Sequence, residues 1–391
     1  MELVTEKSKC CGCQVCGAVC PKKAIEFRED DEGFLYPHID KEKCIECGLC
    51  KKMCAFQTSL QNKETFCTKF QNLYAVKHKD LNVRMSSRSG GIFTAISDIV
   101  LENDGVVYGA MYDKNMEVAH VRAETKEKRN QMRGSKYVQS KTDIEIYSMV
   151  KKDLQEGRIV LYSGTSCQVA SLRSFLNNKK YDNLICMDIV CHGVPSPKVY
   201  RDYLKYWEEK LGNKISDFDF RNKKDYGWAG HVESIFTEKQ KVNSCLYTML
   251  FYQHNVLRPA CYVCPYKGLE HPGDITIADY WGIDRAAPGF SDNKGVSLVL
   301  VNTEVGKEYF DKALKEYESI EAIPTEIEKS MQPPLKEPFK EPDNREAFWE
   351  DYNLHGFNYV VKKYAGNSWK WIVKYRIKKI LMDLQLYKVK R

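Results

Sequence analysis

The sequence of 391 residues contains no apolar run that approaches the roughly 18 residues needed to cross a bilayer. Its first residues, MELVTEKSKCCGC, also lack the apolar core of a signal peptide. We therefore expect a cytoplasmic protein with no transmembrane segment. Apolar residues make up 43% of the chain and charged residues 29%, a balance that excludes disorder and predicts two or three globular domains.

Excess positive charge is absent from most of the chain. The formal net charge is +7, but residues 360–391 hold ten Lys or Arg and one acid, a local charge of +9. The preceding residues therefore carry about −2. A near-neutral body gives no basis for nucleic-acid binding by the whole protein.

Cysteine, by contrast, is abundant. Sixteen cysteines are too sparse for a small disulfide scaffold and too many for chance. In a reducing cytoplasm, metal ligation is a better default than disulfide bonding.

Half of the cysteines form an internal repeat. The spacing C-x2-C-x2-C-x3-C occurs twice, at Cys10, Cys13, Cys16 and Cys20 and at Cys44, Cys47, Cys50 and Cys54. In two-cluster ferredoxins the first three cysteines of each run bind one [4Fe-4S] cluster and the fourth binds the other. We therefore assign cluster I to Cys10, Cys13, Cys16 and Cys54, and cluster II to Cys20, Cys44, Cys47 and Cys50. Zinc knuckles are the alternative, but they separate paired cysteines by longer spacers.

From Leu73 onward, β-branched and aromatic runs alternate with amphipathic segments of helical length. The predicted strands are 73–78, 105–112, 158–163, 183–190, 275–282 and 296–302. The predicted helices are 91–103, 144–157, 169–178, 198–212 and 303–318. This alternation predicts an α/β body with a mostly parallel sheet. We expect a ferredoxin-type domain (1–57), a linker (58–72), two parts of the body (73–152 and 153–330), and a Pro-rich connector with a basic helical tail (331–391).

A second set of cysteines lies in this body. Cys167 and Cys191 each follow a predicted strand, which places both thiols at the carboxyl edge of the sheet, where ligands bind. Cys261 and Cys264 form a C-x2-C-P loop. Together these four cysteines would supply the ligands of a third cluster. A buried apolar role for Cys167 or Cys191, or a zinc site at the C-x2-C loop, are the alternatives.

Several motifs in fixed order resemble one family. They are SGGIFT (89–94), GSKYVQ (134–139), GTSCQ (164–168), CHGV (191–194), FRNKK (220–224) and ADYWG (278–282). Over about residues 5–325 the chain resembles the coenzyme F420 hydrogenase/dehydrogenase family of beta subunits, in its bacterial form with an N-terminal 2[4Fe-4S] ferredoxin domain. Ser166 stands where the family commonly has proline, and Arg88 stands where small residues are usual.

The resemblance implies FAD in the body and a third [4Fe-4S] cluster on Cys167, Cys191, Cys261 and Cys264. A flavin passes electrons between a two-electron hydride reaction and one-electron clusters. The implied function is an iron–sulfur flavoprotein oxidoreductase, with electrons passing between substrate, FAD, the third cluster and then clusters II and I, in either direction. Relatives of this form often accompany surface-polysaccharide genes, which implies a link to that biosynthesis. The alternative is an electron-transfer adaptor that docks a partner enzyme and has no substrate of its own.

The flavin site has several candidate residues. Ser89, Gly90 and Gly91 precede a predicted helix, whose N-terminus suits a phosphate. Arg133 and Lys136 would add positive charge near a pyrophosphate or the flavin N1 region, with solvated surface charges as the alternative. A GxGxxG fingerprint after a strand is absent, so a standard Rossmann site is not expected. His192 is the candidate to donate to flavin or substrate, with a structural histidine as the alternative.

The remaining partners are a redox protein or a small-molecule hydride donor or acceptor. For the basic tail, three interpretations are open: an interfacial helix on anionic lipid, a dock for an acidic redox partner, or a solvated helix packed on the body. The leftover thiols, which we do not expect to be ligands, are Cys11, Cys67, Cys186 and Cys245.

Overall fold

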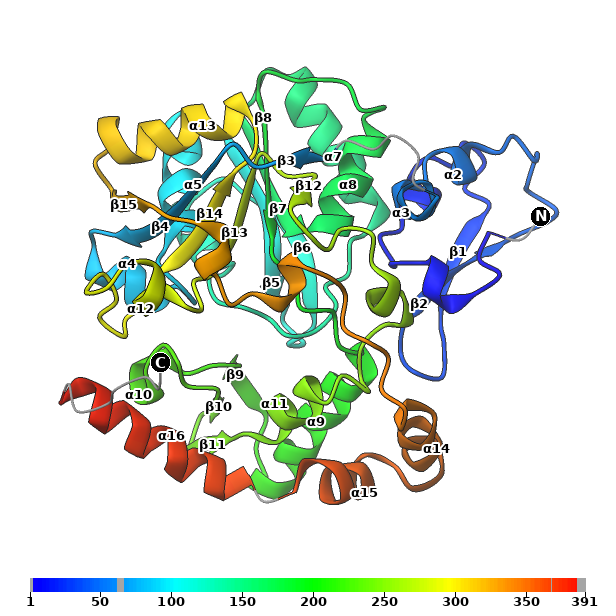
Figure 1. Ribbon diagram of the computed structural model, residues 1–391. Coiled ribbons are helices and arrows are strands. Elements are labelled where there is room, and N and C mark those ends of the chain that lie inside the picture. The colour runs from blue at the N-terminus through cyan, green and yellow to red at the C-terminus, as the bar shows by residue number, and fades with distance from the viewer. Residues whose placement is uncertain (1–2, 62–66, 367, 385–391) are drawn as a thin grey trace.

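The computed structural model describes residues 3–61, 67–366 and 368–384. Figure 1 shows three parts: a small N-terminal domain at one side, a large α/β body, and a lower layer of helices with a small sheet. Within the described ranges, no helix is both long and apolar enough to cross a membrane.

The N-terminal domain contains the two cysteine runs. One antiparallel hairpin, β1 (Ile25–Glu29) with β2 (Leu35–Ile39), lies between them. Each run contains a single helical turn, because the closely spaced cysteines leave room for little more than a loop. The other elements are the 3-10 turn η1 (Lys7–Lys9), α1 (Val15–Ala18), α2 (Leu49–Lys52) and α3 (Ala55–Leu60).

The body is built on a sheet of eight strands. Their order is β15 (Ile320–Pro324), β4 (Asn72–His78), β14 (Ser297–Val301), β13 (Ile275–Asp279), β8 (Leu184–Ile189), β7 (Val160–Thr165), β5 (Val106–Tyr112) and β6 (Val118–Ala123). The central strands β13, β8, β7 and β5 run parallel, and the outer strands pair antiparallel. The predicted α/β body with a parallel sheet is therefore confirmed, with antiparallel strands added at both edges.

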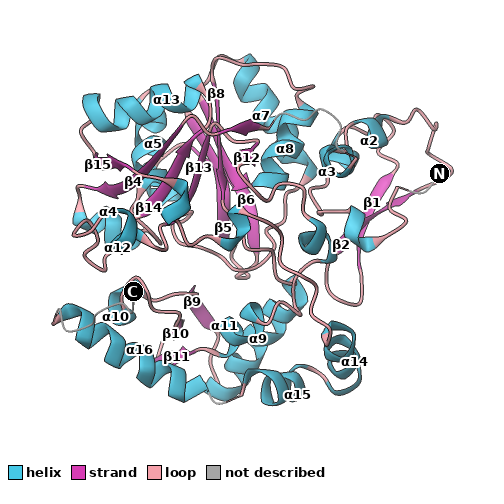
Figure 2. Ribbon diagram, in the orientation of Figure 1, coloured by secondary structure: helices cyan, strands magenta, loops and turns pink. Residues whose placement is uncertain are grey.

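Helices cover both faces of this sheet (Figure 2). Alternate residues of β5 show why: Val107 packs with α5 (Ile92–Glu102) and α13 (Glu304–Asp311), whereas Val106 and Tyr108 pack with α7 (Ile144–Gln155) and α8 (Ser166–Phe175). Short elements complete the body: α4 (Leu81–Ser86), α6 (Lys126–Asn130), α12 (Ile283–Ala286), η2 (Pro259–Val263), the π-helical η3 (Lys312–Glu316), η4 (Ile327–Lys329), η5 (Pro333–Leu335), and the paired strands β3 (Thr68–Lys69) and β12 (Glu270–His271).

The N-terminal domain shares a core with the body. Val15 and Phe56 pack into the same apolar cluster as α7 and α8. A buried ion pair also attaches this domain to the C-terminal part of the chain, since Arg345 donates to Glu32 at 2.8 Å. The N-terminal domain is therefore held in a fixed position against the rest of the chain.

The lower layer is formed by two separate stretches of chain. The first contains α9 (Pro197–Leu211), β9 (Ile215–Asp219), α10 (Lys223–Tyr226), β10 (Glu233–Thr237), β11 (Lys241–Ser244) and α11 (Leu246–Tyr252). The second contains α14 (Arg345–His355), α15 (Phe357–Val360), the π-helical η6 (Val361–Ala365) and α16 (Ser368–Asp383). Both contribute aromatic residues to one core. The expected part 153–330 therefore divides between the sheet and this layer, and the expected helical tail is confirmed over α14 to α16.

Candidate functional site

A cavity of about 330 Å³ lies at the carboxyl ends of β7, β8 and β13. The ends of these strands, the start of α5 and the loop 132–138 form its walls. Carboxyl ends of parallel strands are where open α/β sheets bind ligands. The volume is within the range of small-molecule and cofactor sites. The cavity therefore lies at the edge of the sheet where the sequence predicts ligand binding.

Positive charge dominates the lining of this cavity. Arg88, Arg133, Lys136 and Arg221 all border it, and Asp279 is the only carboxylate among the described lining residues. Asp279 is already paired, since it accepts from Arg221 Nη1 at 2.6 Å and from an indole N–H at 2.8 Å. Burial opposes ionisation of Asp279, but Arg221 and Arg88 hold its pKa below the ordinary value. The remaining charge suits an anionic ligand.

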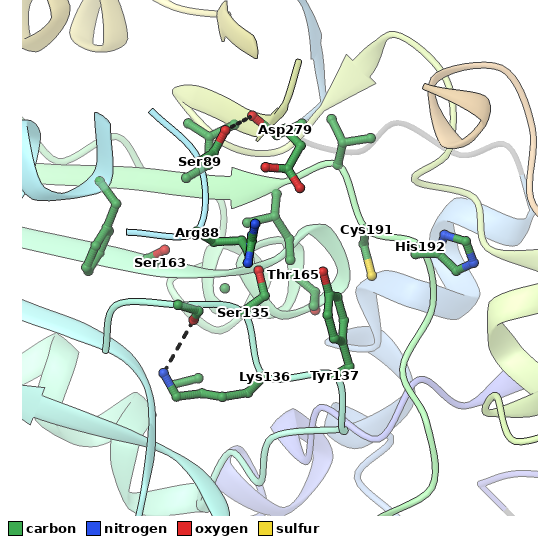
Figure 3. Close-up of a pocket in the computed structure, with 18 of the residues that line it drawn as sticks. Arg88, Ser89, Ser135, Lys136, Tyr137, Ser163, Thr165, Cys191, His192 and Asp279 are labelled. Carbon is green, nitrogen blue, oxygen red and sulfur yellow. Dashed lines mark hydrogen bonds between the residues drawn. The ribbon is translucent and has the colours of Figure 1, made fainter. Parts of the chain in front are cut away.

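Burial destabilises the charged form of two of these cations. It lowers the pKa of Arg88 to about 10, and the nearby Arg221 adds to this effect. Burial also lowers the pKa of Lys136 to about 8. Arg88 Nε is buried without a hydrogen-bond partner among the described residues. In Figure 3 the Arg88 guanidinium, Ser135 and the Tyr137 hydroxyl lie near the middle of the site.

Four of the five residues predicted to bind flavin line the cavity: Ser89, Gly91, Arg133 and Lys136. Gly91 has φ +95° and precedes α5, whose first turn faces the cavity. Lys136 Nζ donates to backbone carbonyls of the loop 131–134, at 3.0–3.4 Å, so it also organises that wall.

Gly90 does not line the cavity. Its N–H donates to Ser297 Oγ at 2.9 Å, and a Cβ at this position would lie 2.1 Å from the carbonyl oxygen of Val76. The glycine is therefore required for close packing against the sheet rather than for contact with a ligand.

His192 lies at the side of the cavity, and Figure 3 shows its ring turned away from the centre. Its Nε2 lies 2.8 Å from His254 Nε2, and its ring packs against Phe339 with centroids 4.2 Å apart. Burial lowers the pKa of His192 to about 3, so the ring is neutral at ordinary pH. These contacts favour the structural interpretation of His192.

A second, smaller cavity lies directly behind the first. All four body cysteines line it, and Cys11 lines it too: Cys11, Cys167, Cys191, Cys261 and Cys264. The cysteines of this group come from a helix start, a strand end and two loops that are far apart in sequence. Burial raises the pKa of Cys261 to about 12, and a backbone N–H donates to its sulfur at 3.4 Å. A hydrogen bond with Cys11 lowers the pKa of Cys167.

These thiols are not gathered around a single point. Among the described residues, no group of three or more His, Cys, Asp or Glu side chains is arranged to hold one metal ion. The cysteines instead surround a volume. Positive charge is close to it, since Arg258 and Lys267 also line this second cavity.

The two cavities share a wall. Thr165, Cys191, Gly193 and Val194 border both of them. Figure 3 shows the Cys191 sulfur beside the large cavity. A ligand in the large cavity and a group held by the cysteines would therefore be neighbours.

The cysteines of the N-terminal domain form two groups. Cys20, Cys44, Cys47 and Cys50 line one small cavity, and Cys47 is exposed. Cys10, Cys13, Cys16 and Cys54 are mutual neighbours, since each of the first two raises the pKa of Cys16 and of Cys54. The grouping matches the two sets that the repeat predicts, and their role as cluster ligands stays a prediction.

The order of the two groups relative to the body differs from the expected one. In the expected electron path the Cys20 group comes next to the body cysteines. In the structure the Cys10 group lies next to them instead. The neighbouring thiols of Cys13 and Cys167 both raise the pKa of Cys11, which therefore lies between the two sets. The repeat is nearly symmetric, so its spacing cannot determine which run faces the body. Long-range packing of Val15 and Phe56 determines this instead.

Arg258 is a site residue that the sequence analysis missed. Its buried guanidinium donates to the Cys10 carbonyl at 2.6 Å, to the Cys10 sulfur at 3.5 Å and to the Leu35 carbonyl at 2.9 Å. It also lies over the ring of Tyr36, 4.4 Å from the centroid. No local pattern marks this arginine, because its partners Cys10 and Leu35 lie more than 200 residues away.

Two other leftover thiols and the residues that end β13 are also placed. Cys186 is buried within the sheet and Cys245 in the lower layer, both outside the cysteine cavities. Asp279 and Trp281 line the large cavity, whereas Tyr280 is fully buried in the core.

Comparisons with known proteins match both the body and the N-terminal domain. Residues 157–326 match the family described as the C terminus of the beta subunits of coenzyme F420 hydrogenase/dehydrogenase, and residues 9–58 match the "4Fe-4S dicluster domain". The chain is 23% identical to one of the subunits of the F(420)H(2) dehydrogenase of Methanosarcina mazei, over 81% of this chain and 86% of that protein. Its N-terminal part is 35% identical to an uncharacterized ferredoxin of Methanocaldococcus jannaschii, over 14% of this chain and 69% of that protein.

One solved structure is also similar in part. A chain of the F420-reducing [NiFe] hydrogenase complex from Methanosarcina barkeri aligns with a TM-score of 0.48 and 20% identity, covering 77% of this chain and 93% of that one.

Proposed function

The chain belongs to the coenzyme F420 hydrogenase/dehydrogenase family of beta subunits and carries a 4Fe-4S dicluster domain, and from this premise we propose that it is an iron–sulfur flavoprotein oxidoreductase. In this proposal FAD occupies the large cavity, a third [4Fe-4S] cluster occupies the cysteine cavity, and clusters I and II continue the path. The partner is a hydride donor or acceptor, or a redox protein.

The observation that carries the proposal is the wall shared by the two cavities. A bound flavin exchanges a hydride with a substrate and single electrons with clusters. Cys191 borders both spaces, so a group in one lies next to a group in the other. Cys11 lies between the cysteine cavity and the Cys10 group. The Cys20 group, which includes the exposed Cys47, would be the last in the path.

The residues of the large cavity fit a dinucleotide. The unpartnered Arg88 Nε, together with Arg133, would bind and neutralise a pyrophosphate, and the start of α5 would add backbone N–H groups. The wall also includes apolar and aromatic surface, including Phe93, Tyr137 and Trp281, against which a flavin ring would pack. Arg88 departs from the small residues usual in the family, and its buried guanidinium supports an anion site at this place.

The thiols of the cysteine cavity fit a cluster better than a zinc ion. A zinc ion needs its ligands within about 2.3 Å of one point, whereas an iron–sulfur cluster separates its thiolates around a larger body. The described thiols surround a volume in this way. Arg258 and Lys267 offset the negative charge that four thiolates would bring.

The test is the cofactor content of the full chain purified without oxygen. We expect a flavin absorbance band and about twelve iron atoms per chain, four for each cluster. Changing Cys261 and Cys264 to serine should remove about four of these iron atoms. Cys245→Ser is the matched control, since this thiol is buried outside the cysteine cavities and should leave the iron content unchanged.

Three results would contradict the proposal. If the protein contains zinc instead of iron, the proposed iron–sulfur clusters are wrong. If the iron content of the double variant is unchanged, the proposed ligands of the third cluster are wrong. Protein with about eight iron atoms and no flavin would support the adaptor without its own substrate. A link to surface-polysaccharide biosynthesis stays a prediction of the family resemblance, because no described contact bears on it.

Helix α16 has no role in the proposed redox chemistry. None of its described residues lines the large cavity or either small one.

A further inference from the structure

Helix α16 is apolar on two faces. Its inner face packs on the lower layer, where Ile372 and Tyr375 contact a small core formed by Tyr226, Val232 and Cys245. The helix lies along α10 and β11 and forms the outer edge of this layer in Figure 1. This inner face accounts for the folding of the helix onto the body.

The other apolar face has no partner among the described residues. It consists of five side chains, which we call the outer stripe: Trp369, Val373, Ile377, Ile380 and Leu384. Their exposed fractions run from 45% to 61%, values that are high for such large apolar residues. Spacings of four, four, three and four residues place all five within an arc of about 80° on the helix.

Basic side chains border this stripe on both sides. Lys370 and Lys374 lie beyond one edge of the arc and Arg376 beyond the other, and all three are exposed. From 368 to 384 the sequence has five Lys or Arg, no Glu, and Asp383 as its one acid. An apolar arc between basic flanks is the pattern of a helix that lies in a membrane interface.

The position of the helix argues against a redox protein as its partner. Figure 1 shows α16 and the N-terminal domain at opposite sides of the molecule. A protein docked on α16 would therefore be remote from the exposed Cys47, where electrons would leave or enter the cluster path. Lipid docking has no such requirement and leaves that domain free.

We propose that α16 docks the protein on anionic lipid, with the outer stripe inserted at the level of the headgroups and the flanking lysines and arginine on the phosphates. The opposing charges of the helix and the lipid, together with the exposed apolar arc, select this partner. Docking would keep the N-terminal domain on the side away from the bilayer.

The docked helix is also connected to the large cavity. Tyr375 on its inner face lies 5.9 Å from the ring of His231, which in turn lies 5.9 Å from the ring of Trp281. Trp281 lines the cavity. The outer stripe thus lies on the outer side of the lower layer, and the large cavity lies on the inner side of that layer.

The test is sedimentation of the full chain with lipid vesicles, independent of its cofactors and activity. We expect binding to vesicles that contain phosphatidylglycerol and weaker binding to vesicles of phosphatidylcholine alone. Ile380→Glu should reduce binding at least about tenfold, because it places a charge in the middle of the apolar arc. Changing Lys370 and Lys374 to glutamine should remove most of the preference for the anionic vesicles and most of the salt dependence.

Leu354→Glu is the matched control. Leu354 is also an exposed apolar residue on a helix, 77% exposed on α14, but it is not part of the outer stripe. We expect its vesicle binding to equal that of the wild type, and we expect an unchanged circular dichroism spectrum for both glutamate variants, since both sites are exposed.

Several results would overturn the docking proposal. One is a wild-type chain that binds neither kind of vesicle. Another is equal binding by Ile380→Glu and the wild type. A dimer in solution that Ile380→Glu separates would assign the stripe to a second copy of the chain, and binding to an acidic protein without any vesicle binding would assign it to a protein partner.

Discussion

Replacing Arg258 by methionine should lower the reduction potential of the cluster nearest the body. Arg258 is 1% exposed, and three of its hydrogen bonds end on the Cys10 carbonyl, the Cys10 sulfur and the Leu35 carbonyl. Burial opposes its charge, but Cys10 and Tyr36 keep the pKa of the guanidinium above its ordinary value. A fixed positive charge beside a cluster favours the reduced, more negative form. Methionine keeps most of the length of the side chain and removes that charge.

The size of the effect follows from the distance. The guanidinium nitrogen lies 3.5 Å from the Cys10 sulfur, so the charge is about 6 Å from the centre of a bound cluster. At an effective dielectric constant of about 20, one unit charge at that distance contributes about 2.8 kcal/mol. For one electron this corresponds to about 120 mV, and screening by nearby water makes a fall of about 50–120 mV the expected result.

The assay is an anaerobic redox titration followed by electron paramagnetic resonance, with iron content measured on the same samples. Arg258→Lys keeps the charge and should keep most of the potential. Arg129→Met is a matched control, because Arg129 is equally buried and ion-paired with Asp98 but lies on α6, away from every cysteine group. It should destabilise the fold and leave the potential unchanged. An Arg258→Met protein with full iron content and an unaltered potential would refute the electrostatic reasoning.

Two further predictions concern Gly90, which packs against the sheet beside the large cavity, and His120, which lines that cavity. Gly90→Ala should lower the free energy of unfolding by about 3 kcal/mol, because its Cβ would lie 2.1 Å from the Val76 carbonyl oxygen; urea denaturation measures this, and an unchanged midpoint would contradict the packing role. His120 is buried, and burial lowers its pKa to about 4. The unfolded chain therefore binds the proton first, so stability should fall as pH drops from about 6.5 to 4, by about 3 kcal/mol in total. His120→Gln should remove this part of the pH dependence in urea denaturation, and an identical slope in the variant would show that other groups cause it.

Much of the body was predictable because its signals are local. Alternating apolar residues mark β5 and β7, and the cysteines that follow β7 and β8 mark the edge where ligands bind. Each of these inferences needs only residues that are close in sequence.

The antiparallel edge formed by β14, β4 and β15 was not predictable in this way. β14 pairs with β4, and β15 pairs with the other side of β4, across more than 200 residues of chain. Strand direction depends on such pairings and not on the composition of a strand. The lower layer was missed for a similar reason, because its core combines α9 and α11 with α14, which returns from the end of the chain.

The same limit applies to the site. The motif around Gly90 and Gly91 was found, but only the packing of the sheet shows that Gly91 faces the cavity and Gly90 does not. Cys11 falls outside the repeat, so its place between Cys13 and Cys167 depends on how the two domains pack.

The number of electrons that the chain accepts tests the proposed path most directly. A flavin takes two electrons and each of three [4Fe-4S] clusters takes one, so an anaerobic titration with a strong low-potential reductant should consume about five electrons per chain. The flavin absorbance should bleach together with that of the clusters. Uptake of about two electrons per chain, without any flavin bleaching, would contradict the path and leave only the two clusters of the N-terminal domain.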